Sequence, residues 1–521
     1  NAGTILGSDC GGNGRCGKCL VRIPNLSMES ISSPADVELQ LLGEKGLKDG
    51  FRLACQATVL NDLLIEIPDT SLLNAEVSSK GPMLLPEHMY SKEPFTHISE
   101  SYGLAVDLGT TTIAVYLCDL DSEKVAGSIS VRNPQAIFGD DVMSRISAVI
   151  DNSSNLTRLQ NMVVKAIQWC VTSLCQSMHI NETGCIKNAV VVGNSTMIHL
   201  FVGENPSSLG AFPYEPRFIE EKTFKAETVG FSFNPYAEIF TLPLISGYLG
   251  SDIVAAALAT ELGKSNPGTM LVDIGTNGEV MLMGKNQLLA ASCATGPAFE
   301  GAAIKHGMHA VSGAIDAVKF DKETGSVICS VIQKDPHTTV QPSGMCGSGV
   351  ISAVAELYRN GFLSGSGQLN SNSGSPYIRY DENGILEFEL VPAQLSQTGR
   401  AITLTQKDIR AIQLAKGALI TGMKLLCDKT DFKVPKRLLV AGAFGTFIDV
   451  EDAKAIGMFP DLPKNNVTGV GNAAGAGAVL SLFDPSLRAK ARELAHSTIV
   501  VALATMPNFE KTFISALAFP E

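Results

Sequence analysis

Two short stretches of this chain share one pattern: Val106-Asp107-Leu108-Gly109-Thr110-Thr111-Thr112 and Val272-Asp273-Ile274-Gly275-Thr276-Asn277-Gly278-Glu279. Each begins as a strand, places an aspartate at the end of that strand, and then turns through glycine into hydroxyl and amide residues. A second strand follows at once, so each stretch predicts a β-hairpin. Such a hairpin presents backbone N–H groups and hydroxyls to a phosphate, while its aspartate holds Mg²⁺, usually through water.

The two copies lie about 166 residues apart and predict two similar lobes with a nucleotide clamped between them. One copy alone would be weak evidence, because a strand that ends in Asp-x-Gly-Thr also occurs as an ordinary turn. We expect Asp107 and Asp273 to organise Mg²⁺ and water. Asp252 is a further candidate for positioning the attacking water, and its alternative role is an acidic residue in the first turn of a helix. The hairpin residues expected to bind the nucleotide are Gly109, Thr110, Thr111, Thr112, Gly275, Thr276, Asn277 and Gly278.

Three further stretches follow in order along the chain. A helix rich in small residues, 246–257, precedes the second hairpin, the strand 438–441 ends where an adenosine would lie, and a second small-residue helix, 469–478, comes next. This order resembles that of the actin-like ATPase superfamily (ASKHA, RNase H-like), which includes sugar kinases, heat-shock chaperones and actin. The resemblance implies an α/β fold of two lobes, about 101–245 and 246–521, that bind ATP. The residues implied to contact the adenosine are Gly442, Ala443, Phe444 and Gly445.

Local signals mark two helix starts and one competing motif. Ser251 is expected to N-cap a helix over 252–262, and Thr405 with Asp408 predicts a capping box. Residues 469–474 match a dinucleotide fingerprint, but no strand is evident before them, so we disfavour a Rossmann site.

Four cysteines near the start of the chain form a second chemical signature. Cys10, Cys16, Cys19 and Cys55 follow the spacing C-x5-C-x2-C-x35-C. Three clustered thiolates and one distant thiolate are typical of a ferredoxin-type 2Fe–2S cluster, whereas structural zinc favours two C-x2-C pairs. We therefore predict a partial β-grasp ferredoxin-like domain over 1–68. Because such domains place about thirty residues before the first cysteine, we expect the start of this domain to be missing from the sequence.

Composition limits the partners. The chain is 45% apolar and 18% charged with a formal net charge of −12, which argues against nucleic acid or an anionic membrane as a partner. No run of about 18 apolar residues occurs, so no membrane-spanning helix is expected. The eight other cysteines are scattered without framework spacing, which indicates reduced thiols in the cytoplasm. Residues 69–100, with three prolines and no periodicity, predict a linker.

A ferredoxin-type domain joined by a linker to an actin-like ATPase resembles the reductive activators of corrinoid proteins, which accompany anaerobic methyltransferase systems. The resemblance covers essentially the whole chain. The stretches that carry it are Asn133-Pro-Gln-Ala-Ile-Phe-Gly-Asp-Asp-Val142, Val191-Val-Gly-Asn-Ser-Thr196, Ala294-Thr-Gly-Pro-Ala-Phe-Glu-Gly301 and Ser343-Gly-Met-Cys-Gly-Ser-Gly349.

The resemblance implies an ATP-hydrolysing enzyme that returns one electron to corrinoid cobalt(II), yielding cobalt(I). It also implies a corrinoid partner protein, an upstream electron donor and a possible homodimer, with a 2Fe–2S cluster, ATP and Mg²⁺ as cofactors. Two alternatives stay open: an activator of another low-potential metalloenzyme such as a dehydratase, and a small-molecule kinase with a fused ferredoxin.

Overall fold

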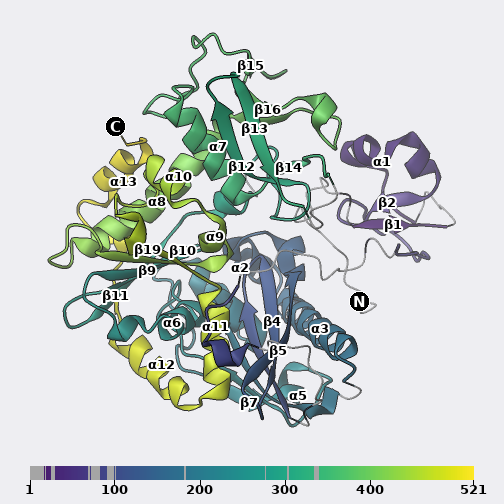
Figure 1. The fold of residues 1–521 in the computed structure, drawn as a ribbon. Coiled ribbons are helices and arrows are strands. Elements are labelled where there is room, and N and C mark those ends of the chain that lie inside the picture. The colour runs from purple at the N-terminus through teal and green to yellow at the C-terminus, as the bar shows by residue number, and fades with distance from the viewer. Residues whose placement is uncertain are drawn as a thin grey trace.

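Two six-stranded sheets organise the chain in the computed structural model, which describes residues 17, 19–24, 30–68, 71, 82–90, 99, 101–180, 183–275, 277–301, 304–333 and 339–520. Figure 1 shows the two lobes built on these sheets and, to the right, a smaller N-terminal unit. The two-lobed α/β architecture confirms the predicted ASKHA fold class.

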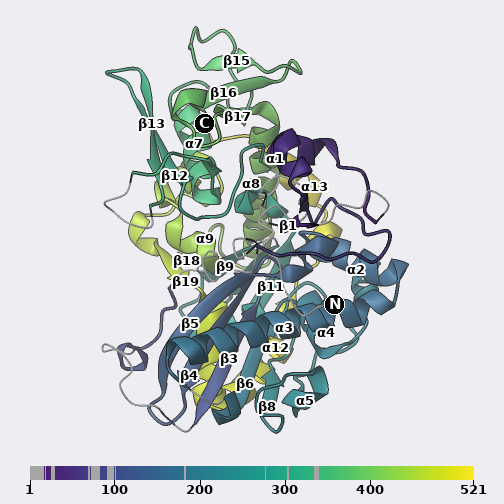
Figure 2. The same ribbon diagram turned by 90° about the vertical axis from the view of Figure 1, so that its right-hand side faces the viewer.

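The lobe I sheet has the strand order β5-β4-β3-β6-β8-β7. Its central strand β3 is buried at every position because helices cover both faces, which explains its nearly continuous apolar sequence. Helix α3 runs across one face of this sheet (Figure 2). The elements of lobe I are β3 (Tyr102–Leu108), β4 (Thr112–Asp119), β5 (Lys124–Arg132), α2 (Val142–Asp151), α3 (Ser154–Ser177), β6 (Ile186–Gly193), α4 (Ser195–Val202), β7 (Thr223–Lys225), α5 (Ala226–Val229) and β8 (Glu238–Thr241).

Lobe II repeats the arrangement in the order β19-β18-β9-β10-β11-β20. In each lobe an antiparallel three-stranded meander (β3-β4-β5 or β9-β10-β11) is extended from its first strand by parallel strands. The elements around this sheet are α6 (Ser251–Ala259), β9 (Thr269–Ile274), β10 (Gly278–Met283), β11 (Leu288–Cys293), α8 (Gln406–Cys427), β18 (Arg437–Ala441), α9 (Gly442–Phe447), α10 (Val450–Ala455), β19 (Val467–Gly471), α11 (Ala473–Phe483), α12 (Ser486–Ser497), β20 (Ile499–Val500) and α13 (Phe509–Leu517).

Two small sheets extend lobe II at the top of Figure 1. Their strands are ordered β13-β12-β14 and β15-β16-β17. The elements are β12 (Ala314–Asp321), β13 (Ser326–Val331), β14 (Gly344–Met345), α7 (Gly347–Arg359), β15 (Ile378–Tyr380), β16 (Leu386–Val391) and β17 (Ile402–Thr405).

Helices α6 and α11 lie between the two large sheets (Figure 1). Helix α11 packs on β3 and β6 of lobe I, while Ile253 and Ala256 of α6 join the core that covers β9 and β10 of lobe II. The two helices touch where a Cβ on Gly477 would lie 2.0 Å from the carbonyl oxygen of Ala255. Small residues therefore let the backbones meet at the junction of the lobes.

The N-terminal unit pairs β1 (Leu20–Arg22) with β2 (Phe51–Leu53) in antiparallel register and adds α1 (Asp36–Lys48). Residues 82–90 then return to the ATPase lobes: Met83 forms a bridge with Gly471, and Tyr90 forms one with Val125. No helix among the residues that the structure describes is long and apolar enough to cross a membrane.

Three local expectations have clear outcomes. The capping box of Thr405 and Asp408 is confirmed at the start of α8. Ser251 is not an N-cap: Gly250 has that position, because the Ser251 hydroxyl instead bonds Gly193 of lobe I. Helix α6 also ends early, at Ala259, since Glu261 has a left-handed backbone with φ of +49°.

The predicted helix over 469–478 was wrong at its start. Residues up to Gly471 belong to β19, which pairs in parallel with β18, and Asn472 then N-caps α11 by accepting a hydrogen bond from the Gly475 amide. A strand therefore does precede the glycine-rich turn, although this strand–helix unit belongs to the ASKHA lobe rather than to a Rossmann domain.

Candidate active site

A cleft between the lobes collects most of the residues singled out from the sequence. Its lining includes Asp107, Gly109, Thr110, Thr111, Thr112, Asp252, Asp273, Gly275, Asn277 and Gly442. Gly278 begins β10 and Gly445 lies within α9, and neither contributes to the lining. Thr276 and the side chains of Ala443 and Phe444 lie outside the described residues.

The first hairpin is closed by a hydrogen bond from the Gly109 amide to the Thr112 carbonyl, 3.0 Å long. Asp107 sits at the end of β3, opposite Val192 of the parallel strand β6, and is almost fully buried. Asn194 follows β6, N-caps α4, and donates from Nδ2 to the Thr110 hydroxyl at 2.9 Å. The turn of the hairpin is therefore held from the neighbouring strand end.

The second hairpin has the equivalent geometry in lobe II. Asp273 lies opposite Ala441 of β18, and the Gly275 amide donates to the Asn277 carbonyl at 3.2 Å. Gly442 follows β18 with φ of +90°, and a Cβ there would lie 3.0 Å from Oδ1 of Asp273. Only glycine combines this left-handed backbone with so close an approach to the carboxylate.

Three carboxyl groups gather on the lobe II side of the cleft. Asp252 starts α6, and Glu279 of β10 lies directly opposite Asp273 of β9. Burial raises the pKa of Glu279 well above its ordinary value, and the charges of Asp252 and Asp273 raise it further. Burial and its two acidic neighbours therefore both favour the neutral form of the Glu279 carboxyl group.

No group of three or more histidine, cysteine or acidic side chains in the described part of the chain is arranged to hold a metal ion. A Mg²⁺ ion bound here with a nucleotide would take one or two carboxylates, with water and phosphate oxygens at its remaining positions. That ligand set is the usual one for Mg²⁺ bound with a nucleotide. The carboxylates of Asp107 and Asp273 suit it in chemistry.

A loop after β11 crosses the cleft from lobe II. Glu300 on this loop accepts a hydrogen bond from the Thr111 hydroxyl at 2.6 Å, so the two lobes touch at the first hairpin. Phe299, Met308 and His309 of the same loop also line the cleft.

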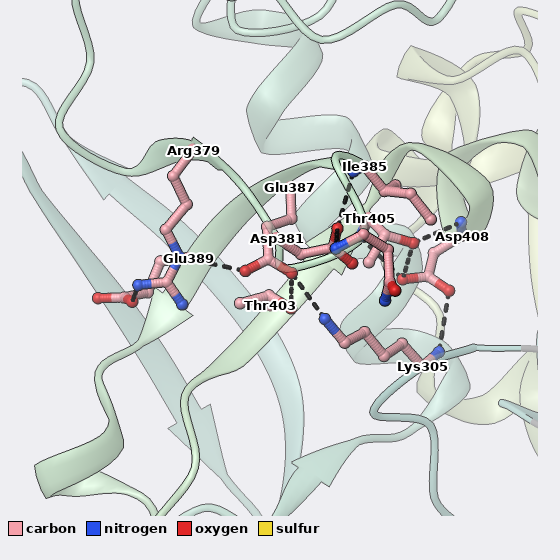
Figure 3. Close-up of polar contacts among 10 residues, drawn as sticks. Lys305, Arg379, Asp381, Ile385, Glu387, Glu389, Thr403, Thr405 and Asp408 are labelled. Atoms are coloured by element: carbon pink, nitrogen blue, oxygen red, sulfur yellow. Dashed lines mark hydrogen bonds and ion pairs between the residues drawn. The ribbon is translucent and has the colours of Figure 1, made fainter.

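Lys305 fixes the middle of that loop, between Glu300 and Met308 (Figure 3). The Lys305 amide donates to Asp408 at 2.9 Å, and its ammonium donates to Glu387 at 2.7 Å. Burial acts to raise the pKa of Glu387, but hydrogen bonds from Lys305, Thr403 and Arg379 outweigh it and hold that pKa below its usual value. The capping-box aspartate of α8 therefore also anchors the loop that covers the site.

Several cleft residues were not predicted from the sequence. Asn194, Glu300, Ser348 and Asn472 line the cleft without belonging to either hairpin motif. Glu279, the last residue of the second motif, also lines it. Asn194 and Glu300 lie within stretches that carried the family resemblance, 191–196 and 294–301, so those stretches held a usable signal. Glu279 closes the second hairpin motif, but the sequence assigned it no role, because that role depends on the strand pairing opposite Asp273.

The cysteine region is described in part. Cys19 precedes β1 and Cys55 follows β2, and the Ala54 amide donates to the Cys19 carbonyl at 2.9 Å, so these two cysteines flank the same end of the sheet. Cys10 and Cys16 lie outside the described residues. Two cysteines at one end of a strand pair are soft donors of the kind that an iron–sulfur cluster takes.

A buried ion pair supports the end of β2 from which Cys55 follows. Arg52 donates to Glu38 of α1 at 2.8 Å, and the Leu53 amide donates to Glu38 Oε1 at 2.9 Å. Burial acts to raise the pKa of Glu38, but hydrogen bonds from Arg52, Ala35 and Leu53 outweigh it, so that pKa lies below its usual range.

Comparison with known proteins agrees with this geometry. The family model "RACo middle region" matches residues 102–265, and "C-terminal domain of RACo the ASKHA domain" matches 268–521. The corrinoid activation enzyme RamQ of Eubacterium limosum is 31% identical over 99% of this chain and 94% of its own length. The chain belongs to the RACo family of reductive activators of corrinoid proteins.

Other RACo-related proteins extend the comparison. The [Co(II) methylated amine-specific corrinoid protein] reductase of Methanosarcina barkeri is 24% identical over 80% of this chain and 77% of its own length. A solved structure of a reductive activator for corrinoid, iron–sulfur protein superimposes with a TM-score of 0.74 at 30% identity, covering 99% of this chain and 93% of that one. The RACo architecture thus extends over nearly the whole chain.

Proposed function

We propose that this protein is an ATP-hydrolysing enzyme that reductively activates a corrinoid protein by delivering one electron to cobalt(II), which yields cobalt(I). The observation that carries the proposal is the match over 99% of the chain to a corrinoid activation enzyme, which spans the cysteine region and both lobes. An upstream electron donor completes the reaction, because the chain must be reduced again after each transfer.

In this proposal Cys10, Cys16, Cys19 and Cys55 hold a 2Fe–2S cluster, which supplies a one-electron carrier with a potential of about −400 mV. The pairing of Cys19 with Ala54 supports it, because it brings the third and fourth cysteines of the motif to one end of β1 and β2. Iron and sulfide analysis of anaerobically prepared protein should give two of each per chain. Zinc in their place would contradict this assignment.

The same proposal assigns Mg-ATP to the cleft between the lobes. Asp107 and Asp273 organise Mg²⁺ and its water, Asp252 orients the attacking water, and the two hairpins bind the phosphates. The support is the position of each aspartate at the end of a strand beside a hairpin turn that lines the cleft. Burial raises the pKa of Glu279, which favours its neutral form and so acts against repulsion among the three neighbouring carboxyl groups.

A physical link between the two functions lies in residues 82–90, which we call the strap. Its Pro82 carbonyl accepts a hydrogen bond from the Asn472 amide at 3.1 Å, and its Met83 side chain is buried in the core shared by α11 and the lobe I sheet. Asn472 also lines the cleft and donates to the Tyr116 hydroxyl at 2.8 Å. Movement of the lobes around a nucleotide would therefore reach the segment that leads to the cysteine region.

The free energy needed to couple nucleotide binding to electron transfer is within the range that nucleotide binding can supply. For a one-electron transfer, each ~59 mV of unfavourable potential is a tenfold change in the equilibrium constant. A difference of a few kcal/mol in nucleotide affinity between two lobe arrangements would cover a gap of roughly 100–200 mV. In this proposal ATP binding changes the arrangement of the lobes, and the cysteine region carries the electron.

The test mixes reduced protein, Mg-ATP and a cobalt(II) corrinoid protein without oxygen and follows the cobalt(I) absorption band. Formation of cobalt(I) should require ATP and should fail in a Cys55→Ala variant. Cys329→Ala, which removes a half-buried thiol from β13 in lobe II, is the matched control and should keep the activity. Cobalt(I) that appears equally fast without nucleotide would contradict the coupling.

A further inference from the structure

The backbone of the first hairpin is held from the side that faces away from the cleft. Three successive carbonyl oxygens of this hairpin, those of Gly109, Thr110 and Thr111, each accept a hydrogen bond from the far side. Asn133 donates to the first from Nδ2 at 2.9 Å and to the third from its amide at 2.7 Å. Arg145 donates to the Thr110 carbonyl from Nη2 at 2.6 Å.

These contacts orient the peptide planes of the turn. In a trans peptide the N–H points opposite to the C=O, so a carbonyl directed backwards sends the next amide forwards. The three carbonyls point to Asn133 and Arg145, which are absent from the described lining of the cleft, whereas the hairpin residues themselves line it. The N–H groups of residues 110–112 are thereby directed to the cleft, as in an anion-binding nest.

Arg145 also brings a charge. It is fully buried on α2, and its remaining donors go to neutral acceptors: Nε to the Gly139 carbonyl, and Nη1 to the Gln135 side chain at 3.0 Å and to the sulfur of Met197. No carboxylate among the described residues forms an ion pair with it, and the carboxylates of Asp140, Asp141 and Glu300 act on its charge only from beyond ion-pair distance. Burial lowers the pKa of this guanidinium to about 10, so it remains charged at neutral pH.

The neighbouring Arg132 provides a contrast. It is also buried, but its guanidinium forms an ion pair with Asp140 at 2.9 Å, so its charge is compensated within the protein. A buried cation without an ion pair is costly unless an anion arrives to compensate it. Behind a hairpin that faces the cleft, that anion would be a phosphate.

Building on the proposed function, we propose that Arg145 is the positioning residue for the nucleotide phosphates: it fixes the turn of the first hairpin from behind and supplies the buried positive charge that the phosphates compensate. The stretch 133–142, which carried the family resemblance without an assigned role, then serves to build this support, because it contributes Asn133, Gln135 and Gly139.

The decisive variant is Gln135→Glu. It leaves the Arg145 guanidinium in place but sets a carboxylate against Nη1, so the local charge is cancelled while the support of the hairpin is kept. Affinity for Mg-ATP should fall by roughly ten- to a hundredfold, with a smaller loss for ADP and the smallest for AMP, because the lost attraction grows with phosphate charge. A purely structural role for Arg145 predicts no such ordering. Arg145→Met should show the same ordering with a larger loss, because it also removes the contact to Thr110.

The matched control is Arg158→Met. Arg158 is an exposed arginine whose guanidinium lies over the ring of Phe138 in the same stretch, 5.2 Å from its centre, and its loss should leave all three affinities unchanged. Calorimetric titration with Mg-ATP, ADP and AMP measures the affinities. If wild-type protein binds ATP but Gln135→Glu binds it equally well, or weakens all three ligands alike, the role of Arg145 is refuted while the nucleotide site stands. If the wild-type protein does not bind ATP, the nucleotide site and this inference fail together.

Discussion

Asp107 and Asp273 occupy equivalent positions in two halves of one molecule. Each ends the first strand of a meander, each lies opposite the last residues of a parallel neighbour, and each precedes a glycine turn that lines the cleft. A carboxylate in such a place suits the role proposed above, holding a cation and its water against a phosphate. The two residues therefore carry the clearest prediction at the scale of single side chains.

Asp107→Asn and Asp273→Asn keep the size of the side chain and remove its charge. We expect each variant to fold and to lose ATP hydrolysis by roughly 10²- to 10³-fold, because Mg²⁺ and its water are no longer organised. Phosphate release measures the rate. Asp431→Asn, which changes an exposed aspartate paired with Lys285, is the control and should hydrolyse ATP normally. Unchanged turnover in both hairpin variants would place the nucleotide elsewhere.

The buried pair of Glu38 and Arg52 predicts a pH dependence for the N-terminal unit. Because the pKa of Glu38 is lowered by folding, its stabilisation is fully present above the unfolded value of about 4.5 and is lost as pH falls towards the lower folded value. The urea concentration at which this unit is half unfolded should therefore become lower when the pH is below about 4.5. Hydrogen exchange of peptides that cover β2 follows the unfolding of this unit.

Replacing Glu38 tests the same pair at neutral pH. Glu38→Gln should destabilise the unit by about 3–5 kcal/mol, because Arg52 is left buried without its partner. The exposed pair of Arg22 and Glu66 in the same unit is the control, and Glu66→Gln should change stability by less than about 1 kcal/mol. A similar effect of both substitutions would contradict the argument from burial.

At the scale of elements, the crossing of α6 and α11 joins the lobes. Gly477 sits against the Ala255 carbonyl, so a methyl group there would force the helices apart. Gly477→Ala should lower the free energy of unfolding by about 1–3 kcal/mol and reduce ATP hydrolysis, because both helices begin beside the cleft.

Gly263→Ala is the matched control for the helix crossing, since a Cβ at Gly263 meets no atom within 4 Å. Urea unfolding compares the two variants. A Gly477→Ala protein as stable as the control would mean that the helices can separate without loss of packing.

At the scale of the whole molecule, the strap follows the cysteine region in the sequence and bonds Asn472 at the candidate nucleotide cleft. Met83 is 7% exposed within the core at the junction of the lobes, whereas its neighbour Leu84 is 56% exposed. The Tyr90 hydroxyl donates to the Met83 carbonyl, so the strap is also bonded within itself. The two adjacent residues offer a matched pair of substitutions.

Met83→Ser should release the strap, speed hydrogen exchange at the Asn472 amide, and make cobalt(I) formation less dependent on ATP while ATP hydrolysis continues. Leu84→Ser removes a similar side chain from the surface and should change none of these. Exchange at Asn472 that is equally fast in both variants would show that the strap does not restrain the cleft.

Much of the fold and of the candidate site could be predicted from the sequence, because these features depend on neighbouring residues along the chain. The two hairpins, the capping box of Thr405 and the two-lobed fold follow from local patterns and their order. The start of α6 could not, because the Ser251 hydroxyl is engaged by Gly193, 58 residues away. The prediction of where α11 starts was wrong for the same reason, since residues 467–471 become a strand only by pairing with β18.

By itself, the sequence determined which chemical groups this protein brings to its two candidate sites: four cysteines, two aspartate hairpins and the glycines beside them. Only the tertiary structure decided which groups meet. It placed Glu279 beside two aspartates, Glu300 against Thr111, Arg145 behind the first hairpin and the strap against Asn472. The physical reason is that propensity and turn chemistry act over a few residues, whereas burial and hydrogen-bond satisfaction depend on partners that are distant in the chain.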